Sequence, residues 1–230
     1  MTKTEELDTL FKRWEDSIPE YKDRFVKDGI INETVWDQTL PKILFIAKEP
    51  NHFENPVPGD FRQDWNTGNL YPFAYRIAEW TFGILDGFKE FGEIEYKKHK
   101  PNSLYQSYLQ KIAFMNLKKL GGGGVCDGKQ LLAHIKTEGH LQFVQDEIKI
   151  IDPDIIILGL SWGSAEAKTK ELILPGINKA LGQCNYSIEV GKLGEMKIID
   201  FYHPSSRNSP SAAYSLLQNV MNSNKFKSLD

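Results

Sequence analysis

The chain has little cysteine. Its 230 residues contain two, Cys126 and Cys184, which lie far apart in the sequence. Two cysteines cannot build a disulfide framework, a four-thiolate metal site or an iron–sulphur cluster. We therefore interpret both as reduced structural residues and expect neither a bound metal nor another cofactor.

Long apolar runs and a strong excess of one charge are also missing. No stretch approaches the roughly 18 consecutive apolar residues of a membrane span, and the first six residues lack the apolar core of a secretory signal. The net charge of −3 at pH 7 gives no overall attraction to nucleic acid, although a local basic patch would suffice. These observations predict a cytoplasmic protein that does not bind a membrane.

What remains is an ordinary globular composition, with 40% hydrophobic and 26% charged residues. A chain of this length can bury a sizeable core in one domain. The sequence shows no repeat, low-complexity segment or clear linker. We expect a single domain over residues 1–230, with an N-terminal amphipathic helix at 5–18 and a frayed tail at about 223–230.

Four short apolar runs predict the strands of a buried sheet, at residues 43–47, 112–117, 155–159 and 197–201. Runs of this length are typical of parallel strands covered on both faces. Because helical periodicity separates them, the sequence predicts a three-layer α/β/α fold with a central, mainly parallel four-stranded sheet. Residues 186–190 form a further candidate strand, and 51–72 form an aromatic-rich ordered loop.

Polar residues follow all four predicted strands, and ligands of open parallel sheets bind at these carboxyl ends. A carboxylate, an amide, an imidazole and hydroxyls on one crevice would form a plausible catalytic site. Taken alone, a histidine or asparagine after a strand is more often a structural residue. The four segments are Lys48-Glu49-Pro50-Asn51-His52, Asn116-Leu117-Lys118-Lys119, Gly159-Leu160-Ser161-Trp162 and His203-Pro204-Ser205-Ser206.

The order of these segments resembles the uracil-DNA glycosylase-like superfamily. Residues 47–52 resemble its first motif, which is Gly-Gln-Asp-Pro-Tyr-His in the best-known branch, and 114–119 resemble the strand whose asparagine reads uracil. Residues 151–159 resemble its pattern of helix end, proline, buried strand and glycine, and 203–206 resemble its His-Pro-Ser loop. The resemblance covers roughly residues 40–220 and implies the fold of this family.

The resemblance also implies an activity, which is hydrolysis of the N-glycosidic bond of uracil or a related damaged base in DNA. Glu49 takes the position of the catalytic aspartate, where a carboxylate stabilises the oxocarbenium-like sugar or orients water. His203 would donate a hydrogen bond to the departing base. Asn116 would pair with O4 and N3 of uracil and reject cytosine.

Further contacts follow from the same resemblance. An aromatic ring should stack on the extruded base, which points to Phe61, with Phe53 as a second choice. The implied partner is single- or double-stranded DNA with a flipped base, bound by a monomer. Asn51 and His52 complete the expected base-binding residues, and the expected phosphate contacts are Lys48, Lys118, Ser205, Ser206 and Arg207.

The sequence departs from the best-known branch at four positions. Glu49 replaces aspartate, Asn51 replaces the tyrosine that excludes thymine, Lys48 replaces glutamine, and Arg207 stands where a leucine wedge is usual. The two cysteines exclude the iron–sulphur branches. These departures leave open a catalytically altered member of the fold that binds a nucleobase, nucleotide or nucleic acid without cleavage.

A minor alternative is a nucleotide-binding enzyme with a phosphate loop. Residues 123–129 fit G-x-x-x-x-G-K, but Gln130 stands where Ser or Thr would bind magnesium. No later predicted strand ends in the aspartate that would complete the metal site. The structural alternative for residues 121–124 is a flexible glycine loop over the crevice, and the basic run 97–100 is either a solvated surface or a phosphate-binding patch.

Overall fold

The computed structural model of the chain describes residues 1–51, 59–70, 72–95, 103–122, 126–185 and 187–229. The helices in these ranges are α1 (Lys3–Ser17), α2 (Glu33–Asp37), α3 (Phe61–Asn66), α4 (Pro72–Leu85), α5 (Ser103–Leu109), α6 (Gly128–Ile135), α7 (His140–Ile151), α8 (Ser164–Ile173), α9 (Ile177–Ala180), α10 (Pro210–Asn222) and α11 (Asn224–Lys227), with the short 3-10 helices η1 (Pro19–Tyr21) and η2 (Phe91–Glu93). The strands are β1 (Val26–Lys27), β2 (Gly29–Ile30), β3 (Ile43–Ala47), β4 (Gly59–Asp60), β5 (Ala113–Asn116), β6 (Ile155–Leu158), β7 (Gly182–Asn185), β8 (Ile188–Leu193) and β9 (Met196–Asp200).

Within the described residues, seven strands form one mixed sheet in the order β2-β5-β3-β6-β9-β8-β7. The strands β5, β3, β6 and β9 pair in parallel, whereas β2 on one side and β8 and β7 on the other pair antiparallel. The expected four-stranded, mainly parallel sheet is therefore corrected to a mixed seven-stranded one. Of the additional strands, β8 overlaps the candidate strand at 186–190, whereas β2 has only two residues and β7 is largely polar, so neither forms an apolar run.

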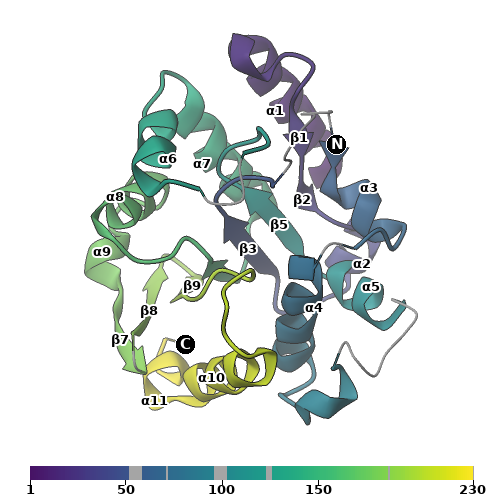
Figure 1. Cartoon of the computed structure of the whole chain (residues 1–230), viewed down its shortest axis with the longest axis vertical. Coiled ribbons are helices and arrows are strands. Elements are labelled where there is room, and N and C mark those ends of the chain that lie inside the picture. The colour runs from purple at the N-terminus through teal and green to yellow at the C-terminus, as the bar shows by residue number, and fades with distance from the viewer. Residues whose placement is uncertain (52–58, 71, 96–102, 123–125, 186, 230) are drawn as a thin grey trace.

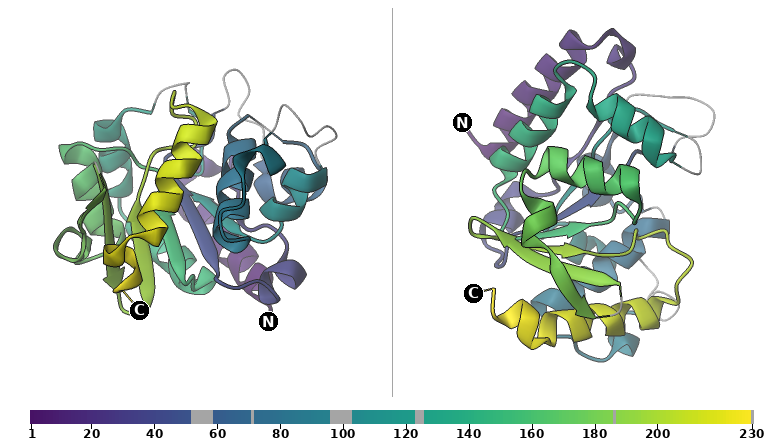
Figure 2. Two further views of the ribbon diagram at one scale, coloured as in Figure 1. Left: turned by 90° about the horizontal axis from the view of Figure 1, so that it is seen from below. Right: turned by 90° about the vertical axis from the view of Figure 1, so that its left-hand side faces the viewer.

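Helices cover both faces of this sheet, as Figure 1 and the right-hand view of Figure 2 show. The side chains of β3 alternate between the two faces because a strand has a period of two residues. Leu44 and Ile46 belong to the core under α1, α6, α7 and α8, and Phe45 belongs to the core under α4, α5 and α10. The uninterrupted apolar sequence of β3 thus serves two cores, and its five residues are all buried.

The two chain ends are both helical. A capping box starts α1, because the Thr2 hydroxyl accepts from the Glu5 N–H (3.2 Å) and Glu5 Oε2 accepts from the Thr2 N–H (2.9 Å). At the other end, the expected frayed tail contains α11, in which Ser223 accepts from the Phe226 N–H and the Phe226 ring is buried. One aromatic side chain docked on the fold orders this segment.

The expected loop at 51–72 also contains regular structure. Its second half includes α3, which begins where the Asp60 carboxylate accepts from the Arg62 N–H (2.9 Å) and the Arg62 guanidinium. The prolines of this segment lie before and after α3. The composition averaged over the whole segment therefore predicts a loop, even though the stretch between the prolines forms a short helix. None of the helices in the described ranges has the length and hydropathy needed to cross a membrane.

Candidate functional site

A cavity of about 350 Å³ opens at the carboxyl ends of β3, β6 and β9. Three of the four polar segments that follow the predicted strands contribute to its wall, so the topology brings together residues that are more than a hundred positions apart. The lining residues are Lys48, Glu49, Asn51, Cys126, Ser161, Trp162, Tyr202, His203, Ser205 and Ser206.

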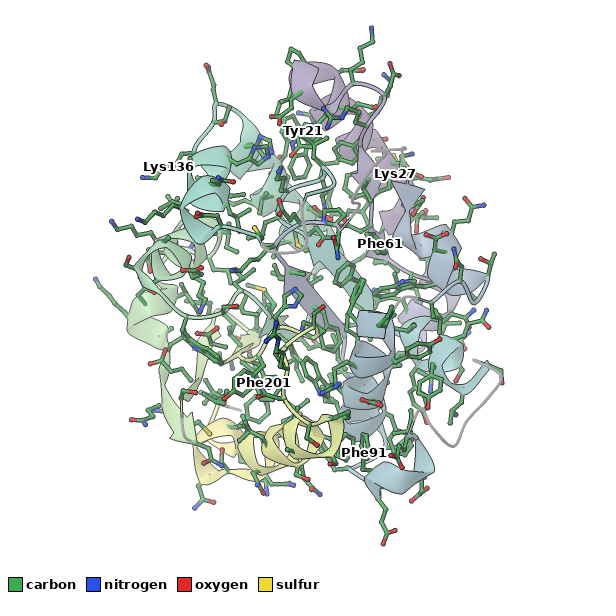
Figure 3. All side chains as sticks on the ribbon, in the orientation of Figure 1. Tyr21, Lys27, Phe61, Phe91, Lys136 and Phe201 are labelled. Atoms are coloured by element: carbon green, nitrogen blue, oxygen red, sulfur yellow. The ribbon has the colours of Figure 1, made fainter. Side chains whose placement is uncertain are left out.

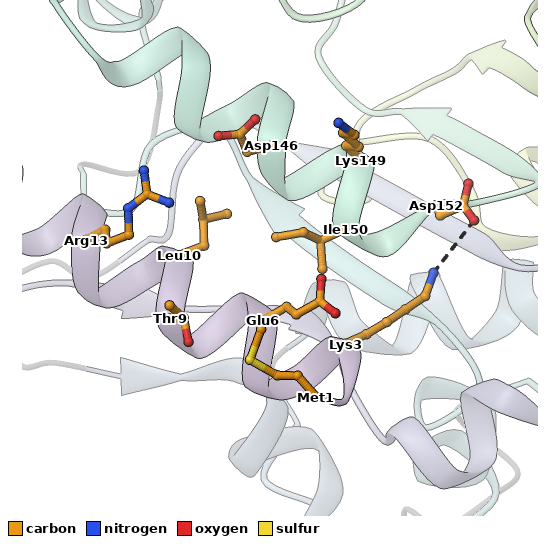
Figure 4. A pocket seen from close by; sticks show the side chains of 10 residues that line it. All are labelled: Met1, Lys3, Glu6, Thr9, Leu10, Arg13, Asp146, Lys149, Ile150 and Asp152. Atoms are coloured by element: carbon orange, nitrogen blue, oxygen red, sulfur yellow. Dashed lines mark ion pairs between the residues drawn. The ribbon is translucent and has the colours of Figure 1, made fainter.

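A hollow of about 440 Å³ lies at the end of α1, beside residues 19–23, and two still larger hollows lie elsewhere in the described part of the chain. One, of about 520 Å³, runs between α1 and α7 and carries the Lys3–Asp152 ion pair at 3.8 Å (Figure 4). The other, of about 770 Å³, includes residues 153–154 and 193–196, which lie at the amino ends of β6 and β9. Ligands of parallel sheets bind at the carboxyl ends, so we take the smaller cavity as the candidate site.

Glu49 lies just beyond the end of β3, and its carboxylate is held from three sides. Lys118 Nζ lies 3.1 Å from Glu49 Oε2, and the Cys126 thiol lies beside the same carboxylate. On the third side is Gly122, where an added Cβ would lie 2.2 Å from Glu49 Oε1. Only glycine at position 122 leaves room for this carboxylate.

The loops that follow β3 and β5 continue the hydrogen bonding of the two strands. The Lys118 N–H donates to the Lys48 carbonyl at 3.0 Å, and the Gly122 N–H donates to the Pro50 carbonyl at 2.8 Å. Asn51 and Gly122 form a parallel bridge. The described part of the glycine loop, residues 121–122, is therefore joined to the Glu49 loop by backbone hydrogen bonds.

Cys126 lines the cavity as a neutral thiol. Burial, reinforced by the nearby Glu49 carboxylate, raises the pKa of Cys126 to about 12. Because a thiolate is the reactive form of cysteine, this residue is a poor nucleophile.

Lys48 has a carboxylate partner of its own. Its Nζ lies 3.3 Å from Glu166 Oε1 at the start of α8, and both side chains are at least 85% buried. Glu166 also packs closely on Gly163 and Gly128, since a Cβ at either glycine would lie within 2.5 Å of the carboxylate. This packing fixes the direction of Lys48 and balances its charge beside the cavity.

His203 is a neutral imidazole with a defined tautomer. Its Nδ1 accepts from the Ser205 N–H at 3.1 Å, so the ring proton is on Nε2. Burial, together with the positive charge of Lys48, lowers the pKa of His203 to about 4. A side chain in this state can donate a hydrogen bond into the cavity near neutral pH without carrying a charge.

Asn116 ends β5 beside Ala47 of β3, but it is not part of the cavity wall. Its N–H donates to Asp28 Oδ2 at 2.7 Å and its Nδ2 lies 3.4 Å from the same oxygen. Its side chain is 2% exposed. Asp28 also binds Lys119, which lies 3.0 Å from Glu147 Oε1, so Asn116 borders a buried charged network.

Phe61 lies within an aromatic cluster of the core, where Figure 3 labels it. Its ring centroid lies 5.7 Å from that of Trp65, 6.0 Å from Phe73 and 5.4 Å from Phe114. Phe61 is 5% exposed and is not part of the cavity wall. The other predicted residues His52 and Phe53, and the basic run 97–100, lie outside the described residues.

The remaining predicted residues divide between the cavity and its surroundings. Asn51, Ser205 and Ser206 line the cavity, whereas Arg207 is exposed on the same loop and Lys118 contacts Glu49 from behind the wall. Sequence reasoning gave no role to Cys126, Glu166, Trp162 or Tyr202. The signal that could have found the last two is an aromatic residue at a predicted strand end.

The geometry gives little support to a phosphate loop. The Asp127 carboxylate caps α6 by accepting from the N–H groups of Lys129 and Gln130, at 2.7 and 3.3 Å. These are the donors that a phosphate at this helix terminus would need. In the described ranges no three or more His, Cys, Asp or Glu side chains are arranged to hold a metal ion.

No protein-family model matches this chain, and no curated protein matches it either. Fold and site therefore define a class: an α/β protein with a mixed sheet and a polar cavity at the carboxyl ends of its parallel strands. Within that class, this cavity combines a lysine-bound carboxylate, a neutral imidazole, three serines and an exposed aromatic ring.

Proposed function

We propose that this chain is a DNA-glycosylase-like hydrolase that cleaves the N-glycosidic bond of uracil or a related damaged base. One observation carries the proposal: Glu49 and a neutral His203 line the same cavity at the carboxyl ends of β3 and β9. Departure of a base creates positive charge on the sugar and negative charge on the base. The two side chains are suited to these opposite charges.

In the proposed reaction, water attacks C1′ of the sugar as the bond from C1′ to the base nitrogen breaks. The Glu49 carboxylate stabilises the cationic sugar or orients the water. The His203 Nε2–H donates to the oxygen of the departing base, which leaves with the bonding electrons and takes up a proton afterwards. The products are the free base and an abasic site.

The binding contacts complete this proposal. Ser205 and Ser206 provide hydroxyls, and Lys48 and Arg207 provide positive charge, for the phosphates that flank a flipped nucleotide. Asn116 has an amide oxygen and a second amide hydrogen that the contacts with Asp28 do not use. Its role as base reader requires that these atoms turn toward the cavity when DNA binds. We propose that the protein acts as a monomer in the cytoplasm.

A second candidate is binding of a nucleobase, nucleotide or nucleic acid without cleavage. The contacts of Glu49 favour it, because a carboxylate paired with Lys118 is less available to a substrate. The buried Asp28 contacts of Asn116 favour it as well. In this case the cavity would recognise a base and leave its bond intact.

Incubation with a labelled oligonucleotide that carries one uracil, single-stranded or opposite guanine, tests the first candidate. Alkali then breaks the strand at any abasic site. We expect cleavage that falls at least about 100-fold in Glu49→Gln and His203→Ala and is unchanged in Lys192→Gln, a lysine outside the cavity. Binding of the same oligonucleotide without strand breakage would contradict the hydrolase and support the second candidate.

A further inference from the structure

The cavity contains an aromatic wall that the predicted stacking residue does not form. Trp162 and Tyr202 both line the cavity, and their ring centroids lie 4.8 Å apart with the planes at 86°. Trp162 is 38% exposed, whereas the four other tryptophans of the chain are at most 1% exposed. A partly exposed indole in the wall of a polar cavity offers an apolar surface to a ligand.

The aromatic wall is held rigidly from behind. The Tyr202 ring lies 5.6 Å from that of Phe201 at 76°, and the Phe201 ring lies 5.1 Å from that of Trp80 at 87°. These edge-to-face contacts link the exposed indole to side chains that are at most 1% exposed. A surface fixed before binding loses little conformational entropy when a ligand stacks on it.

A buried ion pair lies next to Trp162. Lys170 Nζ lies 2.7 and 2.6 Å from the two oxygens of Asp200, and both residues are at most 3% exposed. Trp162 lies close enough to Asp200 to act against the rise that burial causes in the pKa of this carboxyl.

The backbone before Trp162 adopts an uncommon conformation. Ser161 has a φ of +68°, in the left-handed region, which costs a residue other than glycine roughly 1–2 kcal/mol. Ser161 also lines the cavity. Strained backbone at a ligand site is retained where the surrounding structure holds it, and here it directs the chain that carries Trp162.

We infer that Trp162, supported by Tyr202, is the stacking surface for the ring of a nucleobase, and that Lys48, Ser205 and Ser206 beside it bind the phosphate attached to that nucleotide. This assignment is an alternative to Phe61 and rests on the proposed function only for the identity of the ring. Stacking on an aromatic side chain contributes about 1–3 kcal/mol per base, which corresponds to about 5- to 150-fold in affinity.

Two measurements test the inference. In the first, deoxyuridine 5′-monophosphate is added to the wild-type chain and tryptophan fluorescence is followed. We expect quenching that is lost in Trp162→Phe, because the other four tryptophans are buried. In the second, anisotropy gives the affinity for a labelled single-stranded oligonucleotide with one uracil. We expect a loss of at least about fivefold in Trp162→Ala and less than about threefold in Trp162→Phe.

Leu40→Ala is the matched control, because Leu40 is 76% exposed and precedes the amino end of β3, away from the cavity. It should leave both measurements unchanged. Quenching that persists in Trp162→Phe, wild-type affinity in Trp162→Ala, or a wild-type chain that responds to neither probe would overturn the inference. The wild-type titration does not depend on the folding of any variant.

The strand-cleavage assay separates this inference from the proposed function. If uracil is excised and Trp162→Ala binds and cleaves as the wild type does, the stacking assignment fails and the hydrolase stands. The opposite outcome is that uracil is not excised, but the nucleotide quenches the wild-type fluorescence and Trp162→Phe keeps its affinity for the oligonucleotide. In that case the stacking assignment stands and the hydrolase fails.

Discussion

At the scale of single residues, Gly122 fixes the position of the Glu49 carboxylate. A Cβ at position 122 would overlap Glu49 Oε1, so Gly122→Ala must displace this side chain from its contact with Lys118. Because the overlapped atoms are the end of a flexible side chain, the main cost is the lost contact with Lys118, which is about 1 kcal/mol. We expect a loss of that size in the free energy of unfolding, measured by urea denaturation.

A double-mutant cycle provides the control for this prediction. In Glu49→Ala the carboxylate is missing, so adding Gly122→Ala should cost almost nothing, giving a coupling of about 1 kcal/mol between the two sites. Equal costs of Gly122→Ala in both backgrounds would mean that the glycine is needed for another reason.

His203 gives a second prediction, about pH. Its pKa of about 4 means that the imidazole stays neutral from neutral pH down to mild acid. Activity or binding that depends on the Nε2–H should therefore lose nothing to His203 protonation near pH 6.5 and should fall only as the pH approaches about 4. A pH profile measures this, and an acid limb near 6.5 that disappears in His203→Asn would contradict the prediction.

The candidate site was only partly predictable from single residues. Glu49 and His203 follow apolar runs, and the rule that ligands bind at strand ends places them correctly near one cavity. Phe61 is different, because an aromatic residue in a polar loop can turn either toward a ligand or into the core. Its neighbours Trp65 and Phe114 decide this, and Phe114 is far away in the sequence.

At the scale of elements, buried charge connects β5 to α7. Lys119 follows β5, is 0% exposed, and contacts Asp28 and Glu147. Burial raises the pKa of Glu147 well above its ordinary range, which favours the protonated carboxyl. With Glu147 protonated, the positive charge of Lys119 is balanced by the Asp28 carboxylate alone.

This balance predicts unequal costs of substitution. Lys119→Met leaves Asp28 charged and buried without its partner, and removal of one member of a buried pair costs about 3–5 kcal/mol. Glu147→Gln is the matched control, because an amide resembles the protonated carboxyl and should cost less than about 1 kcal/mol. Urea denaturation of both variants measures the difference. Similar large losses in both would show that Glu147 is ionised.

The sequence predicts the elements unequally well. The strands at 43–47 and 155–159 are clear because both faces of each are buried, which requires an unbroken apolar run. β7 has one apolar residue in four and lies at the sheet edge, so it has no such run. Polar side chains such as Glu147 look like the exposed face of an amphipathic helix, and only the folded structure shows that they are buried.

At the scale of the whole molecule, three histidines should lower the free energy of unfolding in acid. The ordinary pKa of a histidine is 6.5, and burial lowers it for all three residues. The pKa falls to about 3 for His140 and to about 4 for His203, and it is also lowered for His134. Below pH 6.5 the unfolded chain therefore binds protons that the folded chain does not. Each histidine then lowers the free energy of unfolding by up to about 1.4 kcal/mol per pH unit.

Urea denaturation between about pH 7 and pH 5 measures this effect. The raised pKa values of Glu147 and Asp200 act in the opposite direction, so the observed slope should be smaller than the sum for three histidines. His140→Gln removes one titrating group and keeps a side chain that can bond to Tyr21. It should reduce the slope, and an unchanged slope would exclude His140 as a source.

The backbone pairing between the loops after β3 and β5 has a consequence for how relatives of this chain can diverge. Insertion or deletion of one residue in 48–51 would shift its partners in 118–122 out of register. Length changes in the two segments should therefore occur together across lineages or not at all. A glutamate at position 49 should likewise be inherited with a glycine at position 122.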